Sequence, residues 1–260
     1  MADFLDVLAQ NAKKTINEGY YELSTSISTT VVSLKKAIVE SKHTPIITEI
    51  KAASPSLGII RQDFSPERVA EAMEKGGAVG ISVLTEPKHF KGSLISLAKV
   101  RETVRLPLLM KDIILSPIQL ENASKIGANA VLLIEALFER GYCECDTHEM
   151  IAKAHSENLE VLLETHDENE FRFAIDSDAD LIGINNRDLG TLKVDLGVTK
   201  RILEKNDAQG KIVVSESGIK TIANLHFLHK CGAYAFLIGS TIMLAANIEK
   251  KVKEFVLAFE

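Results

Sequence analysis

Four ionisable side chains stand at the ends of short apolar runs, where buried strands would meet solvent. Glu49 and Lys51 close the first run, Lys111 follows another, and Glu164 follows a third. A lysine in such a place can bind an anion or act as a general acid, and we expect partial burial to lower its pKa. Desolvation would raise the pKa of Glu164 toward values useful for general-acid chemistry. Two lysines and two glutamates together favour an enzyme.

Each of these residues also has a purely structural interpretation. Glu49 and Lys51 are two residues apart, so in a strand their side chains point the same way and could form an ion pair. Lys111 could bury its methylene stem and extend its ammonium into water. Convergence of all four residues on one place favours catalysis over these interpretations.

Asn185 and Arg187 are also spaced by two, after another apolar run. The planar guanidinium matches a carboxylate or a phosphate, and the asparagine amide can donate to a carbonyl or hydroxyl. Arg187 could instead pair with Asp188 or Glu216. The spacing therefore indicates substrate binding without excluding a local ion pair.

Two glycine-containing turns point to a phosphate site. Ser217 and Gly218 follow one of the last apolar runs, and Gly239 and Ser240 follow the final one. Glycine at a strand-to-helix turn lets backbone N–H groups surround an anion. Either turn alone could be merely structural, but the matched pair predicts phosphate binding.

These side chains need a scaffold that brings distant parts of the chain together. Eight short apolar runs can supply it, and polar residues follow nearly every one. The runs are residues 45–50, 80–84, 107–110, 130–134, 159–163, 180–184, 211–214 and 233–238. Strands alternating with helices predict the α/β class and a (β/α)8 TIM barrel, whose strands end on one shared catalytic face.

The segments between the runs are typical of amphipathic helices. Serine–proline pairs begin two of them, at 65–66 and 116–117. Helices are expected near residues 65–75, 93–104, 117–127, 147–157, 167–176, 195–205, 219–230 and 241–258. We expect residues 1–260 to form one domain, with 45–260 as the barrel. Residues 1–44 would be a helical extension covering part of it, with helical stretches near 2–18 and 31–42.

The connection over residues 51–65 is long for a strand-to-helix loop. It contains Ser54 and Gly58 and has a charged tip at residues 61–63. Long loops of this kind are often lids over active sites, although a plain surface loop has the same appearance.

Composition excludes several classes of function. The net charge of −6 offers no basic stripe for nucleic acid, while it leaves room for a phosphorylated small molecule. No run of 18 apolar residues is present and the start does not have the pattern of a signal peptide, so we expect no membrane association. Three cysteines are a poor disulfide framework and indicate a cytoplasmic protein.

No cofactor or metal is expected. Cys143 and Cys145 with His148 do not have the spacing of a zinc site, and no glycine-rich nucleotide motif is present. None of the seven histidines forms an evident catalytic pair, and only His89 is expected near the barrel mouth.

A set of motifs resembles those of the indole-3-glycerol phosphate synthase family. They occur in family order at residues 49–56, 84–92, 111–112, 164–166, 184–189, 215–219 and 239–240. The helical extension fits that family too. The resemblance implies a tryptophan-biosynthesis enzyme that converts 1-(2-carboxyphenylamino)-1-deoxyribulose 5-phosphate into indole-3-glycerol phosphate by ring closure, decarboxylation and dehydration.

The resemblance also implies catalytic roles. Lys111 would protonate the substrate ketone as the ring closes, and Glu164 would take part in the proton transfers of dehydration. Lys51 would contact the carboxylate or phosphate of the substrate, and Glu49 would orient the lysines. Asn185 would line the polar side of the site and meet the substrate hydroxyls or the carboxylate. Which group is the acid at which step stays open.

The substrate-binding residues follow in the same way. Arg187 and Glu216 would meet substrate hydroxyls or the carboxylate, and Ser54 would act at the loop entrance. The phosphate would be held by Ser217, Gly218, Gly239 and Ser240. The aromatic ring would lie against Phe90, Leu133, Leu192 and Ile238. Departures from the family pattern occur at Ala52, Ile113 and Glu135, which bear on substrate affinity.

Two other functions remain as alternatives. One is another phosphate-binding barrel such as phosphoribosylanthranilate isomerase, which often uses cysteine or aspartate with aspartate. The other is a catalytically silent phosphate-binding barrel, which would lack Lys111 or Glu164. We expect a small phosphorylated substrate as the partner and a monomer, with contacts to other tryptophan-pathway enzymes left open.

Overall fold

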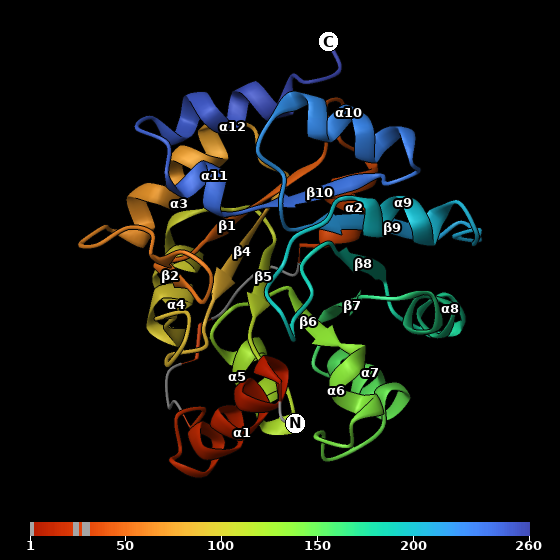
Figure 1. Cartoon of the computed structure of the whole chain (residues 1–260). Helices are drawn as coiled ribbons and strands as arrows, with labels where there is room; N and C mark the ends of the chain where they lie inside the picture. The colour runs from red at the N-terminus through yellow and green to blue at the C-terminus, as the bar shows by residue number, and fades with distance from the viewer. Residues whose placement is uncertain (1–2, 23–25, 28–31) are drawn as a thin grey trace.

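Eight parallel strands close into a barrel in the computed structural model, which describes residues 3–22, 26–27 and 32–260. The strands are β1 (Ile46–Ile50), β4 (Gly80–Leu84), β5 (Leu108–Lys111), β6 (Ala130–Ile134), β7 (Glu160–Thr165), β8 (Leu181–Asn185), β9 (Ile212–Glu216) and β10 (Ala235–Ile238). They pair in chain order, and β10 returns to β1. The predicted (β/α)8 barrel is confirmed (Figure 1).

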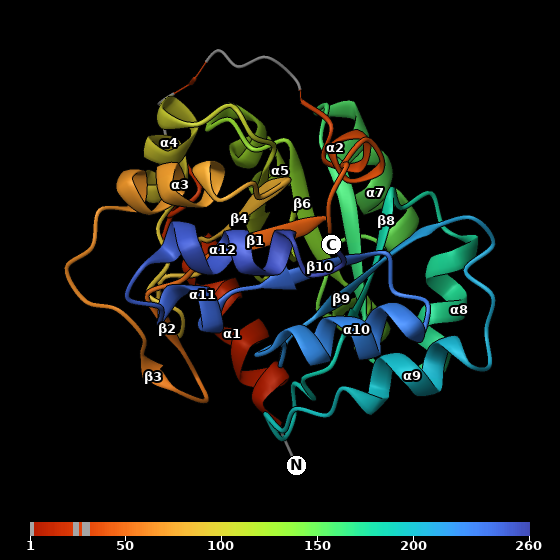
Figure 2. The same cartoon turned by 90° about the horizontal axis from the view of Figure 1, so that it is seen from above.

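Helices surround the barrel on the outside (Figures 1 and 2). They are α3 (Pro66–Lys75), α4 (Leu94–Thr103), α5 (Pro117–Lys125), α6 (Glu135–Glu139), α7 (Thr147–Ser156), α8 (Glu168–Asp176), α9 (Gly197–Leu203), α10 (Ile222–Lys230), α11 (Ser240–Met243) and α12 (Ile248–Val256). Ser65 and Ser116 cap α3 and α5 ahead of proline, as expected.

Side chains alternate along each strand between the barrel interior and the helices, because the side-chain period of a strand is two. Leu132 packs inside the barrel with Leu109 and Leu162. Leu133 instead belongs to the cluster formed with the surrounding helices, which includes Ile151 of α7. The same alternation turns residues at the carboxyl ends of the strands toward the barrel axis.

The N-terminal extension contributes two helices that lie apart (Figures 1 and 2). The first is α1 (Phe4–Asn17), whose Phe4 and Leu8 reach the cavity at the carboxyl ends of the strands. The second, α2 (Leu34–Val39), lies at the other end, where the Leu34 N–H donates to Glu160 at the start of β7. Residues 2 and 31, which begin the two expected helical stretches, lie outside the described residues.

Three local features differ from the sequence-based expectation. The long loop after β1 contains a hairpin of β2 (Ala53–Ser54) and β3 (Gly58–Ile59). The short helix α6 follows β6 directly, and the final helix is divided into α11 and α12. No helix in the described part of the chain is long and apolar enough to cross a bilayer.

Candidate active site

A cavity of about 370 Å³ opens at the carboxyl ends of the barrel strands, where such barrels carry their chemistry. Its wall contains all of the predicted site residues except Glu216 and Leu133. The cavity residues of that set are Glu49, Lys51, Ser54, Phe90, Lys111, Glu164, Asn185, Arg187, Leu192, Ser217, Gly218, Ile238, Gly239 and Ser240.

Lys111 lies among carboxylates at the end of β5. Its Nζ is 2.6 Å from Glu216 Oε2 and 3.4 Å from Glu164 Oε2. Burial alone would lower the pKa of Lys111, but the negative charges of Glu216, Glu164 and Glu49 outweigh it and raise that pKa. The expected lowering is therefore wrong, because the sequence alone could not show how many carboxylates surround the ammonium.

The two glutamates beside Lys111 differ in protonation. Burial acts to raise the pKa of Glu164, but Lys111 and His166 outweigh it and lower that pKa. The expectation that Glu164 has a raised pKa is thus wrong. Glu216 is the carboxyl with a raised pKa, because it is fully buried and close to the charge of Glu164. One carboxylate and one readily protonated carboxyl therefore flank the same lysine.

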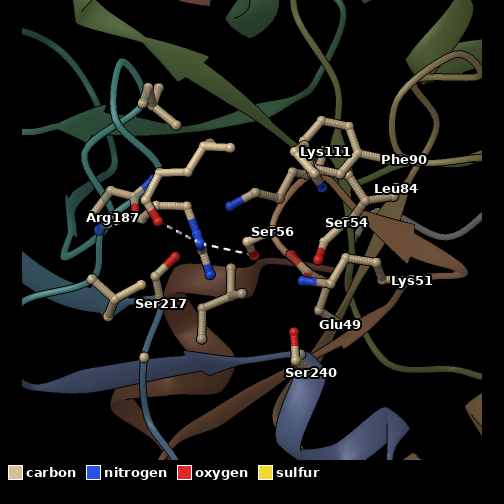
Figure 3. Close-up of a pocket in the computed structure, with 18 of the residues that line it drawn as sticks. Glu49, Lys51, Ser54, Ser56, Leu84, Phe90, Lys111, Arg187, Ser217 and Ser240 are labelled. Atoms are coloured by element: carbon tan, nitrogen blue, oxygen red, sulfur yellow. Dashed lines mark hydrogen bonds and ion pairs between the residues drawn. The ribbon is translucent and has the colours of Figure 1, made fainter. Parts of the chain in front are cut away.

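Glu49 and Lys51 form an ion pair at the end of β1 (Figure 3). Glu49 is 3% exposed, and the charges of Lys51 and Lys111 overcome its burial to lower its pKa. Gly239 lies against this carboxylate, since a Cβ at that position would be 2.1 Å from Glu49 Oε1. The turn after β10 therefore approaches the Glu49 carboxylate so closely that only glycine fits at position 239 without a shift of its neighbours.

Arg187 joins two loops over the cavity. Its Nη1 donates to Ser56 Oγ of the hairpin loop and to the Leu192 carbonyl, both at 3.0 Å (Figure 3). Its backbone N–H donates to Asn185 Oδ1 at 3.0 Å. The guanidinium thus holds the long loop, which carries Ser54, over the cavity.

The two glycine turns lie side by side because β9 and β10 are neighbours in the barrel. Ser217 and Gly218 both have positive φ values, of 65° and 82°. A Cβ on Gly218 would be 2.3 Å from Val194 Cγ1, so glycine is required there for both conformation and space. Ser217 and Ser240 lie across the cavity from Phe90 and Leu84 (Figure 3).

Part of the cavity wall is apolar. Phe90, Leu192 and Ile238 belong to it as expected, and Ile113 does so as well. The Glu86 carboxylate accepts N–H bonds from Lys88, His89 and Phe90, which fixes the turn that carries the phenyl ring.

Leu133 is not part of this wall, which corrects the expectation. It points to the helices, and its neighbours Leu132 and Ile134 line the cavity instead. Glu135 is also outside the cavity. It begins α6 and accepts a bond of 3.0 Å from the Thr147 hydroxyl.

Sequence reasoning missed several contributors to the site. Phe4 and Leu8 line the cavity from the extension, and no pattern in the sequence links them to strand ends far along the chain. His89 hydrogen-bonds to Asn11 of α1 at 2.8 Å, which helps to hold that helix over the mouth. His166 lies 3.3 Å from Glu164, a contact that the sequence did not indicate. The described residues contain no cluster of three or more side chains suited to a metal ion.

Comparisons with known proteins agree with this geometry. A family model described as "Indole-3-glycerol phosphate synthase" matches residues 5–255. A protein of that name from Methanocaldococcus jannaschii is 46% identical over 231 residues, covering 86% of this chain and 83% of the relative. Another, from Caldanaerobacter subterraneus, is 44% identical over 214 residues, covering 81% and 79%.

The solved structures include a thiamine phosphate pyrophosphorylase from Pyrococcus furiosus. It superposes with a TM-score of 0.60 at 19% identity and covers 86% of this chain and 96% of that one. At this identity the likeness shows the shared barrel fold and nothing further.

Proposed function

Because the chain belongs to the indole-3-glycerol phosphate synthase family, we propose that it acts as a carboxy-lyase making indole-3-glycerol phosphate for tryptophan biosynthesis. The substrate would be 1-(2-carboxyphenylamino)-1-deoxyribulose 5-phosphate. One observation carries the proposal: Lys111 lines one cavity together with apolar side chains and both glycine turns.

The cavity suits the three parts of this substrate. The phosphate would meet the backbone N–H groups of the turns at Ser217–Gly218 and Gly239–Ser240. The aromatic ring would lie against Phe90 on the apolar wall. The ketone and its neighbouring hydroxyls would then lie between these ends, near Lys111.

Ring closure forms a bond between the carboxyl-bearing ring carbon and the ketone carbon. Lys111, charged because of the surrounding carboxylates, donates to the ketone oxygen as it gains electron density. Electron deficiency then falls on the ring and its nitrogen. The bond to the carboxylate breaks, CO₂ departs, and its electron pair restores the ring.

Dehydration completes the indole. The new hydroxyl leaves as water after taking a proton, and the neighbouring carbon gives up a proton to a base. Glu164 is suited to be that base because its lowered pKa keeps it ionised. Glu216, with a raised pKa and 2.6 Å from Lys111 Nζ, is suited to return a proton to the lysine.

The remaining polar residues would bind and orient the substrate. Lys51, held by Glu49, would face the substrate carboxylate until it leaves as CO₂. Asn185 would contact a hydroxyl, and Arg187 would hold the loop of Ser54 over the bound molecule. We also propose that the protein is a monomer and that it is cytoplasmic, the location being in keeping with its three free cysteines.

The alternative functions fit the cavity less well. No cysteine lines the cavity within the described residues, as an isomerase with a cysteine–aspartate pair would require. A silent barrel would have no use for the carboxylates gathered around Lys111, since they are costly to bury.

A steady-state assay tests the proposal. Purified protein is mixed with the carboxyphenylamino substrate, without added metal or nucleotide, and the fluorescence of the indole product is followed. Turnover supports the synthase. Absence of turnover with retained phosphate binding would favour the silent barrel.

A further inference from the structure

His166 lies between two carboxylates directly behind the cavity. Its Nε2 is 3.3 Å from Glu164 Oε1, and its Nδ1 is 3.2 Å from Glu170 Oε2. The imidazole is 15% exposed and does not line the cavity. A chain of charged groups therefore runs from Lys111 through Glu164 and His166 to Glu170.

Local structure fixes this arrangement. Asp167 caps α8 by accepting from the N–H groups of Asn169 and Glu170. Glu170, in the first turn of that helix, reaches back and accepts from the His166 backbone N–H at 2.7 Å. The same Glu170 oxygen also faces Nδ1 of His166. Glu170 therefore contacts both the backbone and the ring of His166, which fixes the ring relative to α8.

The surroundings favour a charged imidazole. Burial lowers the pKa of His166, but Glu164 and Glu170 outweigh it and raise the pKa to about 10. The other ionisable groups near this cluster are Glu135, Glu139 and Arg140 at α6, Asp167 at the start of α8, Asp188 after β8 and Lys111 of β5. Two of these groups are basic: Lys111 lies beyond Glu164, and Arg140 lies at the end of α6, where it acts on Glu139.

We propose that His166 is a positioning residue that keeps Glu164 ionised and directs its carboxylate toward the substrate. One oxygen of Glu164 faces the imidazolium and the other faces Lys111. The imidazolium therefore influences both the orientation and the negative charge of the Glu164 carboxylate from the side away from the cavity. Glu164 then serves as the proton acceptor of dehydration. This inference rests on the function proposed above and deepens it by assigning one acid–base role.

The pH dependence of kcat in His166→Gln tests the proposal. Glutamine removes the positive charge, so the pKa of Glu164 should rise. The acidic limb of the profile should move to higher pH, so that the loss of kcat relative to the wild type grows as the pH falls below about 5, with KM changed by less than about threefold. Glu170→Gln should give a smaller shift, since it leaves the imidazole in place.

His155→Gln is the matched control. That histidine also lies beside a carboxylate, 2.9 Å from Asp180 Oδ2, but it does not line the cavity or contact its residues. Its pH profile should overlap that of the wild type. If the profile of His166→Gln overlaps as well, with kcat lowered equally at every pH, His166 is only structural and the proposal fails.

A measurement on the free protein separates the two proposals. Nitrogen-15 NMR of the histidine rings should show His166 as an imidazolium near pH 8, assigned by its loss in His166→Gln. A neutral ring at that pH would overturn the inference even if the wild type turns over. Lack of turnover by the wild type would count against the proposed function, while the ring signal would still report on His166.

Discussion

Lys111 Nζ lies 2.6 Å from Glu216 Oε2, although Glu216 itself does not line the cavity. The lysine therefore joins a fully buried carboxyl to the cavity where substrate would bind. Gly183, across the ladder from β7, leaves the space that Glu216 needs, since a Cβ there would be 2.4 Å from Glu216 Oε1. The acid–base centre thus includes a buried carboxyl, that of Glu216, which lies behind the residues of the cavity wall.

Lys111→Ala should remove most of the activity and leave the fold intact. The variant lacks the only donor that the account places at the ketone oxygen, so kcat should fall by roughly a thousandfold or more. Lys153→Ala, on an exposed part of α7, is the control. Near wild-type turnover by Lys111→Ala, measured with circular dichroism to confirm folding, would refute the donor role.

Gly239→Ala should impair substrate binding. The added methyl would be 2.1 Å from Glu49 Oε1, and Glu49 is buried and paired with Lys51, so the turn must move. We expect KM to rise by about tenfold or more, since a phosphate held by backbone N–H groups is sensitive to their placement. Gly210→Ala, which meets nothing within 4 Å, should lower stability without changing KM. An unchanged KM in Gly239→Ala would remove this turn from the phosphate site.

Leu132 and Leu133 allow a test of side-chain direction. Leu132→Ala should raise KM because Leu132 lines the cavity. Leu133→Ala should leave KM unchanged and destabilise the fold by about 2–5 kcal/mol, the cost of a buried leucine among helices. Kinetics and urea unfolding of the two variants distinguish these effects, and the reverse pattern would show that the strand faces the other way.

Glu135 should make stability depend on pH. Burial and the charges of Glu139 and Glu170 raise its pKa to about 7, so folding favours the neutral acid. The free energy of unfolding should therefore fall as pH rises from the unfolded pKa, near 4.5, to about 7. Glu135→Gln should remove this loss and be more stable at pH 8 by roughly 1–3 kcal/mol.

The control for this effect is Glu71→Gln on the exposed face of α3. Urea unfolding of both variants and the wild type at pH 5 and pH 8 provides the comparison. If Glu135→Gln does not raise the free energy of unfolding at pH 8, the Glu135 carboxyl is ionised in the folded state without lowering stability, and the prediction is wrong.

The barrel was predictable from sequence because buried parallel strands require continuous apolar runs, and polar residues after them mark the catalytic face. The positions of Lys111, Glu164 and the glycine turns followed from that pattern. Which of Leu132 and Leu133 faces the barrel interior could not be predicted, because in a run that is apolar throughout the residue types do not show which side chains point inward.

Contacts between distant segments could not be predicted from the sequence because they depend on how the folded elements are placed relative to one another. The pKa of Lys111 depends on three carboxylates from β1, β7 and β9, and its direction can be judged only when they are placed together. Phe4 reaches the cavity from α1, whose docking no local pattern specifies. His166 pairs with Glu164 through a turn whose geometry depends on the start of α8.

The most direct test of the account is the release of labelled CO₂ from substrate carrying carbon-14 in its carboxyl group, measured together with indole formation. Ring closure at the carboxyl-bearing carbon requires that one CO₂ is released for every indole product formed. Lys111→Ala should show almost no CO₂ release and almost no product. Formation of product without release of labelled CO₂, or equal release by Lys111→Ala, would contradict the mechanism built around Lys111.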